Sequence, residues 1–187
     1  QAISQALLEV GHKADAKAAL AAINEDPYFF LRLSMAACKV MADAGHGVAG
    51  SSIVTAMAFN CRQFAIRVSG LGDRWWTGSM PKVHARFFTG YGEKDLAWMG
   101  GESPITETAG LGAFAQCAAF ALQAYQGGSP AEMLRRQRRL YRITTTEHPD
   151  FKIPFLSFRG VPTGIDVFKV VKTGFAPLIN IGIAGLA

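Results

Sequence analysis

Three short turns of the chain combine glycine with charged or hydroxyl side chains, a combination that suits the binding of a small anion. The first turn covers residues 69–76 (SGLGDRWW) and follows Arg67. Its two glycines let the backbone approach a ligand, and Arg67 and Arg74 flank them with positive charge, with Asp73 beside them. The third glycine of a dinucleotide-binding fingerprint is missing. The pattern therefore indicates either an anion contact or a plain surface turn in which Asp73 and Arg74 make local contacts.

The second turn, residues 105–112 (ITETAGLG), places two hydroxyls and a carboxylate at the mouth of an apolar run. Backbone N–H groups at a helix start can hold an anion, to which the side chains of Thr106 and Thr108 could add. Glu107 could orient an amide or ammonium group there. The alternative is that Glu107 only caps the helix, where a negative charge is stabilising.

The third turn, residues 158–166 (FRGVPTGID), repeats the theme. Arg159 precedes two glycines, Thr163 lies between them, and Asp166 stands at a helix start with Lys169 one turn further on. We infer that the three turns converge on one anion site. A pure scaffold would have less need of three such turns in a chain of this size.

Metal and nucleophile chemistry find little support in the sequence. No serine lies in a G-x-S-x-G elbow, and no cysteine has an evident histidine partner. The four histidines share no ligand spacing, and the three cysteines lie far apart. We therefore predict no metal, no cofactor and no disulfide framework. These residues are His12, His46, His84, His148, Cys38, Cys61 and Cys117.

Composition limits the class of protein. The chain has 187 residues, half of them hydrophobic, enough for a real core. Nineteen Lys and Arg against 14 Asp and Glu give a net charge of +5, which favours anionic ligands without demanding nucleic acid. No run of about 18 uncharged apolar residues is present, so we predict no membrane span. The absence of a signal peptide and the cysteine usage favour the cytoplasm.

The elements that would position these turns follow from periodicity and capping signals. We expect helices over 2–10, 15–23 and 26–44, and a hairpin of strands 52–59 and 64–68. Further short strands are predicted over 75–77 and 83–88, followed by a loop over 90–108 and a long apolar helix over 111–125. These elements predict a helical N-terminal segment over 1–49 and an α+β domain over 50–187.

Capping boxes mark the later helices. Ser129-Pro130-Ala131-Glu132 opens an amphipathic helix within 129–145, and Thr163 to Asp166 is interpreted as a second box opening a helix to Lys172. A buried strand is expected over 178–183. The exposed face of the first of these helices could bind phosphate or simply be solvated. It carries Arg135, Arg138, Arg139 and Arg142.

The fold class predicted from these elements is α+β. It has a helical N-terminal part and a hairpin or mixed-sheet core with buried helices, a pattern compatible with a small helical subdomain. The sequence lacks an initiator Met and stops inside the apolar stretch 179–187, so we expect an internal piece of a longer chain.

Four blocks in order resemble the YlbE/AllG family. They are GSSIVTAMAFN, FAIRVSGLGDRWWTG, ITETAGLGAFA and FRGVPTGIDVFKVV followed by INIGIAG, and the resemblance runs from about Tyr28 to the end. Family members are much longer, so the chain is similar to their C-terminal portion. The family was long catalogued only as a domain of unknown function.

The resemblance implies a cytoplasmic bacterial subunit of an oligomeric carbamoyltransferase with companion subunits of the FdrA type. The associated reaction is phosphorolysis of oxalurate to oxamate and carbamoyl phosphate, in purine and allantoin catabolism. Phosphate, carbamoyl phosphate and oxamate are anions, which suits the three turns. The Ser-Thr-Arg-Thr motif of aspartate and ornithine carbamoyltransferases is absent, so the chemistry would use a different site.

On this hypothesis each candidate residue has a role. Arginines would clamp anions, threonines with nearby N–H groups would hold the phosphate or amide, and an acidic residue would orient the carbamoyl NH2. The arginines are Arg67, Arg74 and Arg159, the threonines Thr106, Thr108 and Thr163, and the acidic residues Glu107 or Asp166, with Asp73 and Lys169 as further binding candidates. The alternatives are a non-catalytic scaffold or regulatory subunit, or an anion-binding module without turnover.

Overall fold

The computed structural model describes residues 5, 9, 13–26, 28–60, 62–80, 87, 89–95, 101–120 and 129–179. The chain forms two compact units, residues 1–37 and 38–187, which are described separately. As predicted, helices occupy the N-terminal part and small antiparallel sheets form the core, which is a mixed α+β fold. The domain division at residue 50 stays a prediction.

The first unit is helical. Helix α2 (Lys13–Glu25) and the first part of α3 (Phe29–Ala44) confirm the helices predicted over 15–23 and 26–44. Asp26 caps the second of these as expected, because its Oδ1 accepts a hydrogen bond from the Tyr28 N–H at 2.9 Å. The helix predicted over 2–10 lies almost entirely outside the described residues.

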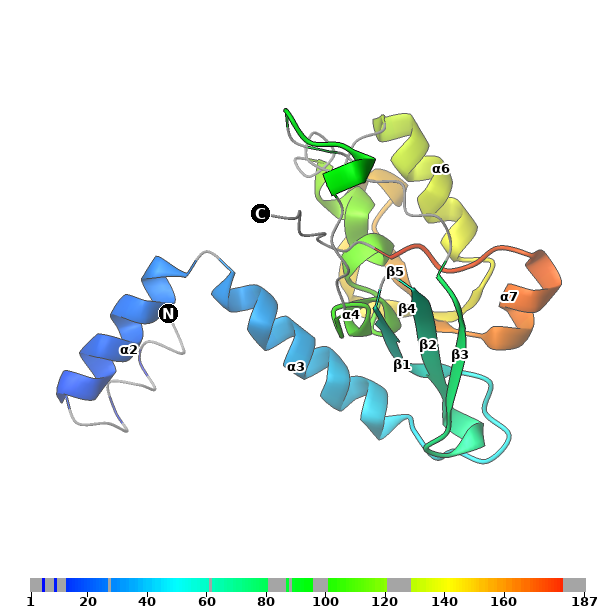
Figure 1. The fold of residues 1–187 in the computed structure, drawn as a ribbon, viewed down its shortest axis with the longest axis horizontal. Coiled ribbons are helices and arrows are strands. Elements are labelled where there is room, and N and C mark those ends of the chain that lie inside the picture. Colours follow the sequence, from blue (N-terminus) through cyan, green and yellow to red (C-terminus); the bar gives the residue numbers. More distant parts are fainter. Residues whose placement is uncertain are drawn as a thin grey trace. The chain divides into compact units, whose positions relative to one another are not determined.

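Three antiparallel strands open the second unit, β1 (Val54–Phe59), β2 (Gln63–Val68) and β3 (Trp75–Ser79), in that order across the sheet (Figure 1). The predicted hairpin is confirmed, with Phe59 opposite Phe64 and the Asn60 Oδ1 accepting from the N–H groups of Arg62 and Gln63 in the turn. The strand predicted over 83–88 falls on residues that the structure describes only at position 87.

A second antiparallel pair, β4 (Thr144–Ile153) and β5 (Arg159–Ile165), was not predicted as strands. The capping box predicted at Thr163 is wrong, because Thr163 lies within β5. The N-cap of α7 (Val167–Thr173) is Asp166, whose Oδ1 accepts from the N–H groups of Phe168 and Lys169. Asp166 also forms a single bridge to Ile53, which connects this region to the start of β1.

The capping box at Ser129 is confirmed. Its Oγ accepts a hydrogen bond from the Glu132 N–H at 3.2 Å and opens α6 (Pro130–Leu140). The buried side of α6 carries Met133, Gln137 and Leu140. Of the predicted arginines, Arg135, Arg138 and Arg139 lie on its exposed side, and Arg142 is exposed in the turn after it.

The long α-helix predicted over 111–125 is wrong in its described part, which forms a short 3-10 helix instead. A single turn, α4 (Ile105–Thr108), lies inside the predicted loop, and a 3-10 helix follows over Gly112–Ala118. Gly112 has φ +60°, which an α-helix does not allow, and the Ala113 N–H bonds to a side chain instead of a helical carbonyl. Leu178 and Ile179 lie in no strand, and the rest of the strand predicted over 178–183 lies outside the described residues.

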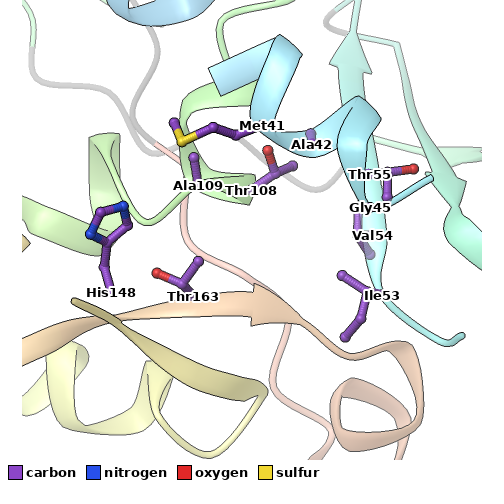
Figure 2. Close-up of a pocket in the computed structure, with 10 residues that line it drawn as sticks. All are labelled: Met41, Ala42, Gly45, Ile53, Val54, Thr55, Thr108, Ala109, His148 and Thr163. Atoms are coloured by element: carbon purple, nitrogen blue, oxygen red, sulfur yellow. The ribbon is translucent and has the colours of Figure 1, made fainter. Parts of the chain in front are cut away.

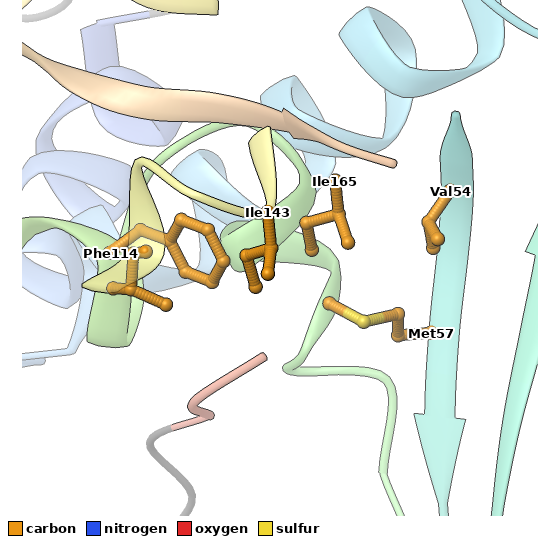
Figure 3. Close-up of a cluster of buried hydrophobic side chains, with 6 residues drawn as sticks. Val54, Met57, Phe114, Ile143 and Ile165 are labelled. Atoms are coloured by element: carbon orange, nitrogen blue, oxygen red, sulfur yellow. The ribbon is translucent and has the colours of Figure 1, made fainter. Parts of the chain in front are cut away.

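The core connects the two sheets through side chains from several elements (Figure 3). It is a contiguous cluster from β1, the 3-10 helix, the end of α6, the turn that follows α6, and β5, in which every member is at most 4% exposed. Its members are Val54, Met57, Phe114, Leu140, Ile143 and Ile165. No helix in the described part of the chain is long and apolar enough to cross a bilayer.

Candidate functional site

A cavity of about 160 Å³ lies in the second unit, where α3, β1, α4 and the β4–β5 pair meet (Figure 2). Its polar lining residues are Thr55, Thr108, His148 and Thr163, and the rest of the lining is aliphatic or glycine. The volume is below the range of drug-sized or nucleotide pockets, so the cavity suits a small metabolite.

Two of the three predicted turns meet at this cavity. Gly110, at φ +82°, lies directly against β5, where a Cβ would overlap the Thr163 Oγ1 and come within 2.8 Å of the Val161 Cγ2. Only glycine allows both the left-handed conformation and this close approach. The contact brings Thr108 and Thr163, which are far apart in sequence, to the same wall.

Glu107 lies behind that wall. Its side chain is fully buried, and its carboxylate accepts hydrogen bonds from the Thr106 hydroxyl at 2.8 Å and from the Ala113 N–H at 3.0 Å. Burial raises the pKa of the neighbouring Cys38 thiol to about 11, and the negative charge of Glu107 contributes to that shift. The carboxylate therefore holds the second turn together from the interior.

The charged side chains of the first turn form contacts away from the cavity. The Arg67 Nη2 lies 2.6 Å from the Asp43 Oδ1, and its Nη1 lies 3.8 Å from the Asp73 Oδ1. The Arg74 guanidinium lies 3.8 Å from the centroid of the Trp76 ring, a cation–π contact. These residues do not line the cavity.

Arg159 lies at a second, smaller hollow of about 120 Å³ with Tyr141 and Thr144 to Glu147. Its guanidinium lies 3.9 Å from the Tyr141 ring centroid, and its Nε donates to the Glu147 Oε1 at 3.1 Å. The hydrogen bonds from Arg159 lower the pKa of the Glu147 carboxyl. The Lys169 Nζ donates to the Thr144 carbonyl at 2.6 Å, so it fastens α7 to β4.

His148 lines the cavity, although its sequence context gave no reason to select it. Its Nδ1 accepts hydrogen bonds from the backbone N–H groups of Asp150 and Phe151, both at 3.1 Å, and its ring stacks on Phe151 with centroids 3.9 Å apart. Spacing could not have found it, because these partners are backbone groups formed by a local bend of β4. No group of three potential metal ligands occurs among the described residues.

The protein thus has a mixed α+β fold with the small cavity described above. Among the described residues, no carboxylate and no arginine side chain lines this cavity. Residues 1–103 match the model of the family described as oxamate carbamoyltransferase subunit AllG. The chain belongs to this family, which confirms the resemblance predicted from the sequence.

Two curated relatives from Escherichia coli K12 support the assignment. The chain is 38% identical over 185 residues to the uncharacterized protein YahG, covering 98% of this chain and 39% of the relative. It is 41% identical over 157 residues to the oxamate carbamoyltransferase subunit AllG, covering 83% of this chain and 38% of that subunit. The chain thus spans about two fifths of the length of these relatives.

A solved structure shares the fold. The crystal structure of a conserved protein of unknown function from Enterococcus faecalis V583 superposes with a TM-score of 0.85 at 40% identity, covering 97% of this chain and 46% of that one. The arrangement of elements described above is therefore shared with part of that solved structure.

Proposed function

We propose that this chain is part of a carbamoyltransferase subunit that acts on oxalurate and phosphate, or in reverse on oxamate and carbamoyl phosphate. The observation that carries the proposal is the 41% identity to the AllG subunit of an oxamate carbamoyltransferase, together with the family match. FdrA-type companion subunits, an oligomeric assembly, a role in purine or allantoin catabolism and a cytoplasmic location belong to the same proposal.

The chemistry sets what such a site must provide. In the direction of carbamoyl transfer to oxamate, the oxamate amide nitrogen attacks the carbamoyl carbon of carbamoyl phosphate. The bond from that carbon to the phosphate oxygen breaks, phosphate leaves with the electron pair, and the attacking nitrogen loses a proton. Charge develops on the carbonyl oxygen and on the leaving phosphate, so hydrogen-bond donors fixed near both lower the barrier.

The cavity supports the binding part of this proposal, because it is small and presents hydroxyls and an imidazole. Thr108 and Thr163 are the predicted site residues that line it. Thr106 and Glu107 act on it from behind by holding the turn that carries Thr108. Asp166 in turn caps α7, directly after the strand that carries Thr163.

The anion-clamping role of the arginines and the binding roles of Asp73 and Lys169 stay proposals, and the structure sets a condition for two of the arginines. Arg74 and Arg159 would have to leave Trp76 and Glu147, respectively, to reach a ligand. The substitutions Arg74→Ala and Arg159→Ala should then each raise the KM for phosphate or for carbamoyl phosphate and leave the unfolding midpoint unchanged. Unchanged kinetics in both variants would remove the arginines from the proposal.

The test of the proposed function uses the complete enzyme complex with its companion subunits. It is incubated with carbamoyl phosphate with and without oxamate, and phosphate release is measured. We expect release that depends on oxamate and is absent with oxalate, which lacks the attacking nitrogen. No oxamate-dependent release from a complex shown to contain its companion subunits would contradict the proposal.

A docking role is favoured by one specific observation. On α7, the side chains of Phe168 and Val171 are 73% and 81% exposed, which is unusual for two large apolar groups on one short helix. If the chain acts as a scaffold or regulatory subunit, Phe168→Asp should release a companion subunit in size-exclusion chromatography. Retention of an intact complex would argue against docking through this helix.

A further inference from the structure

The two threonines of the cavity have their hydroxyl protons already committed to the protein. The Thr163 Oγ1 donates to the Val161 carbonyl at 3.1 Å, and the Thr108 Oγ1 donates to the Ile105 carbonyl at 2.6 Å. A hydroxyl has one proton and two lone pairs, so what remains for a ligand at each threonine is an acceptor. The cavity therefore offers acceptors at Thr108 and Thr163.

His148, in contrast to the two threonines, offers a hydrogen-bond donor to a ligand. Its Nδ1 accepts two backbone N–H groups, so this nitrogen carries no proton, and in the neutral ring the proton is on Nε2. The stacking on Phe151 fixes the ring plane. Figure 2 shows the ring standing up from β4 with one nitrogen on the side of Ala109, and the Thr163 oxygen turned toward the His148 side. His148 thus offers a donor at the same cavity to which Thr163 offers an acceptor.

The remaining lining excludes a fully charged group. It consists of Met41, Ala42, Gly45, Ile53, Val54, Thr55 and Ala109, and the Thr55 Oγ1 is engaged by the His46 Nδ1 at 2.9 Å. Among the described residues no lysine, arginine, aspartate or glutamate side chain lines the cavity. An anion placed there would lose water without gaining an opposite charge, which is costly. The ligand group must be neutral and must carry both donors and an acceptor.

We propose that this cavity binds the carboxamide group of the substrate, with the His148 Nε2–H donating to its carbonyl oxygen and the hydroxyl oxygens of Thr163 and Thr108 accepting from its NH2. A carboxamide has one strong acceptor and two N–H donors, which is the complement of this lining. The identity of the amide as oxamate or its carbamoyl derivative rests on the proposed function; the preference for an amide over a carboxylate does not. His148 is then a binding residue that selects between these two groups.

The first experiment compares matched ligands on the complete complex. Binding of acetamide against acetate, and of oxamate against oxalate, is measured by ligand-observed NMR. Each pair differs only by an amide in place of a carboxylate. We expect each amide to bind at least about ten-fold more tightly than its carboxylate partner, since one unpaired buried group has an effect of that size. Equal affinities, or no measurable binding of either amide, would overturn the proposal.

The second experiment changes the lining. Thr163→Val removes the acceptor, and Thr163→Ser keeps it; His148→Phe removes the donor but keeps a ring that can stack on Phe151. We expect oxamate binding to weaken about ten-fold in Thr163→Val and in His148→Phe, and to stay within about two-fold in Thr163→Ser. The matched control is Thr145→Val, whose hydroxyl also donates to a β5 carbonyl, at 3.3 Å to Gly164, but borders the other hollow.

The failure of this inference is separable from that of the proposed function. If carbamoyl transfer to oxamate occurs and its KM for oxamate is unchanged in Thr163→Val and His148→Phe, the cavity is not the amide site, although the activity stands. If the complex shows no transfer but oxamate binding falls in these two variants alone, the amide site stands and the reaction is a different one. Equal unfolding midpoints of the variants exclude misfolding as the cause of a loss.

Discussion

The backbone of Gly112 lies against the carboxylate of Glu107. A Cβ at position 112 would overlap the Glu107 Oε1 and lie 2.6 Å from its Cδ, and Gly112 has φ +60°. This contact explains why the apolar stretch after α4 forms a 3-10 helix. The chain turns around a buried carboxylate, which accepts a hydrogen bond from the Ala113 N–H. A packed polar group, rather than apolar periodicity, sets the local structure here.

Gly112→Ala should therefore destabilise the protein by at least about 2 kcal/mol, because it adds both backbone strain and overlap with an enclosed side chain. The measurement is denaturant unfolding followed by circular dichroism. Gly78→Ala is the control, since a Cβ at that position of β3 meets no atom within 4 Å. Equal midpoints for the two variants would mean that the Glu107 side chain can move aside.

Ser129→Ala should lower the free energy of unfolding by about 1 kcal/mol, because the Glu132 N–H loses its capping acceptor at the start of α6. Ser129→Asn keeps an acceptor and should stay within a few tenths of a kcal/mol of the parent. The free energy of unfolding of the three proteins measures this. An equal loss of stability in both variants would show that the hydrogen bond from the Glu132 N–H to the side chain at position 129 does not account for the effect.

The Glu147–Arg159 pair should make stability depend on pH. Hydrogen bonds from Arg159 lower the pKa of Glu147 in the folded state, so the stabilisation is present above the unfolded value and is lost as pH falls through the folded one. Because both side chains are partly exposed, we expect Glu147→Gln to lose less than about 1 kcal/mol at pH 7.

This difference between parent and Glu147→Gln should shrink as the pH falls below about 4. Unfolding at a series of pH values gives the measurement, with the exposed Asp150→Asn as a matched variant on the same strand. A difference that stayed constant between pH 7 and pH 3 would assign the effect to packing and not to charge.

The thiols of Cys38 and Cys117 should be unreactive in the folded protein. Both are fully buried, and burial raises the pKa of each to about 11, so very little thiolate is present at pH 8. In a Cys61→Ser background, an aromatic disulfide reagent should label them at least about ten-fold more slowly than in guanidinium chloride. Rapid labelling of either cysteine, located by mass spectrometry, would contradict their burial.

Elements with local signals could be predicted from the sequence. The Ser129 box, the Asp26 cap and the 59–64 hairpin turn depend on residues within a few positions of each other, and all three are present. The four blocks also identified the family correctly. Local side-chain chemistry was therefore enough for helix starts, for one hairpin and for the family.

Features that depend on distant contacts could not be predicted. The β4–β5 pair contains Pro149 and Pro162 and polar residues on both faces, so it lacks the alternation typical of a strand. Thr163 was interpreted as a cap because its spacing to Asp166 fits one, yet pairing with β4 determines its conformation. His148 becomes part of the cavity only through that same pairing, and it was therefore missed.

The close approach of Gly110 to β5 limits how this protein can diversify. A side chain at 110 or a larger one at 163 would push the turn off the strand, so these two positions cannot change independently. Met41, by contrast, reaches the cavity from α3 with a flexible thioether and is 44% exposed. We therefore expect relatives to differ at position 41, where a change can alter the size of the ligand that fits without loss of folding. Position 41 is also the first place to substitute in order to change the substrate preference.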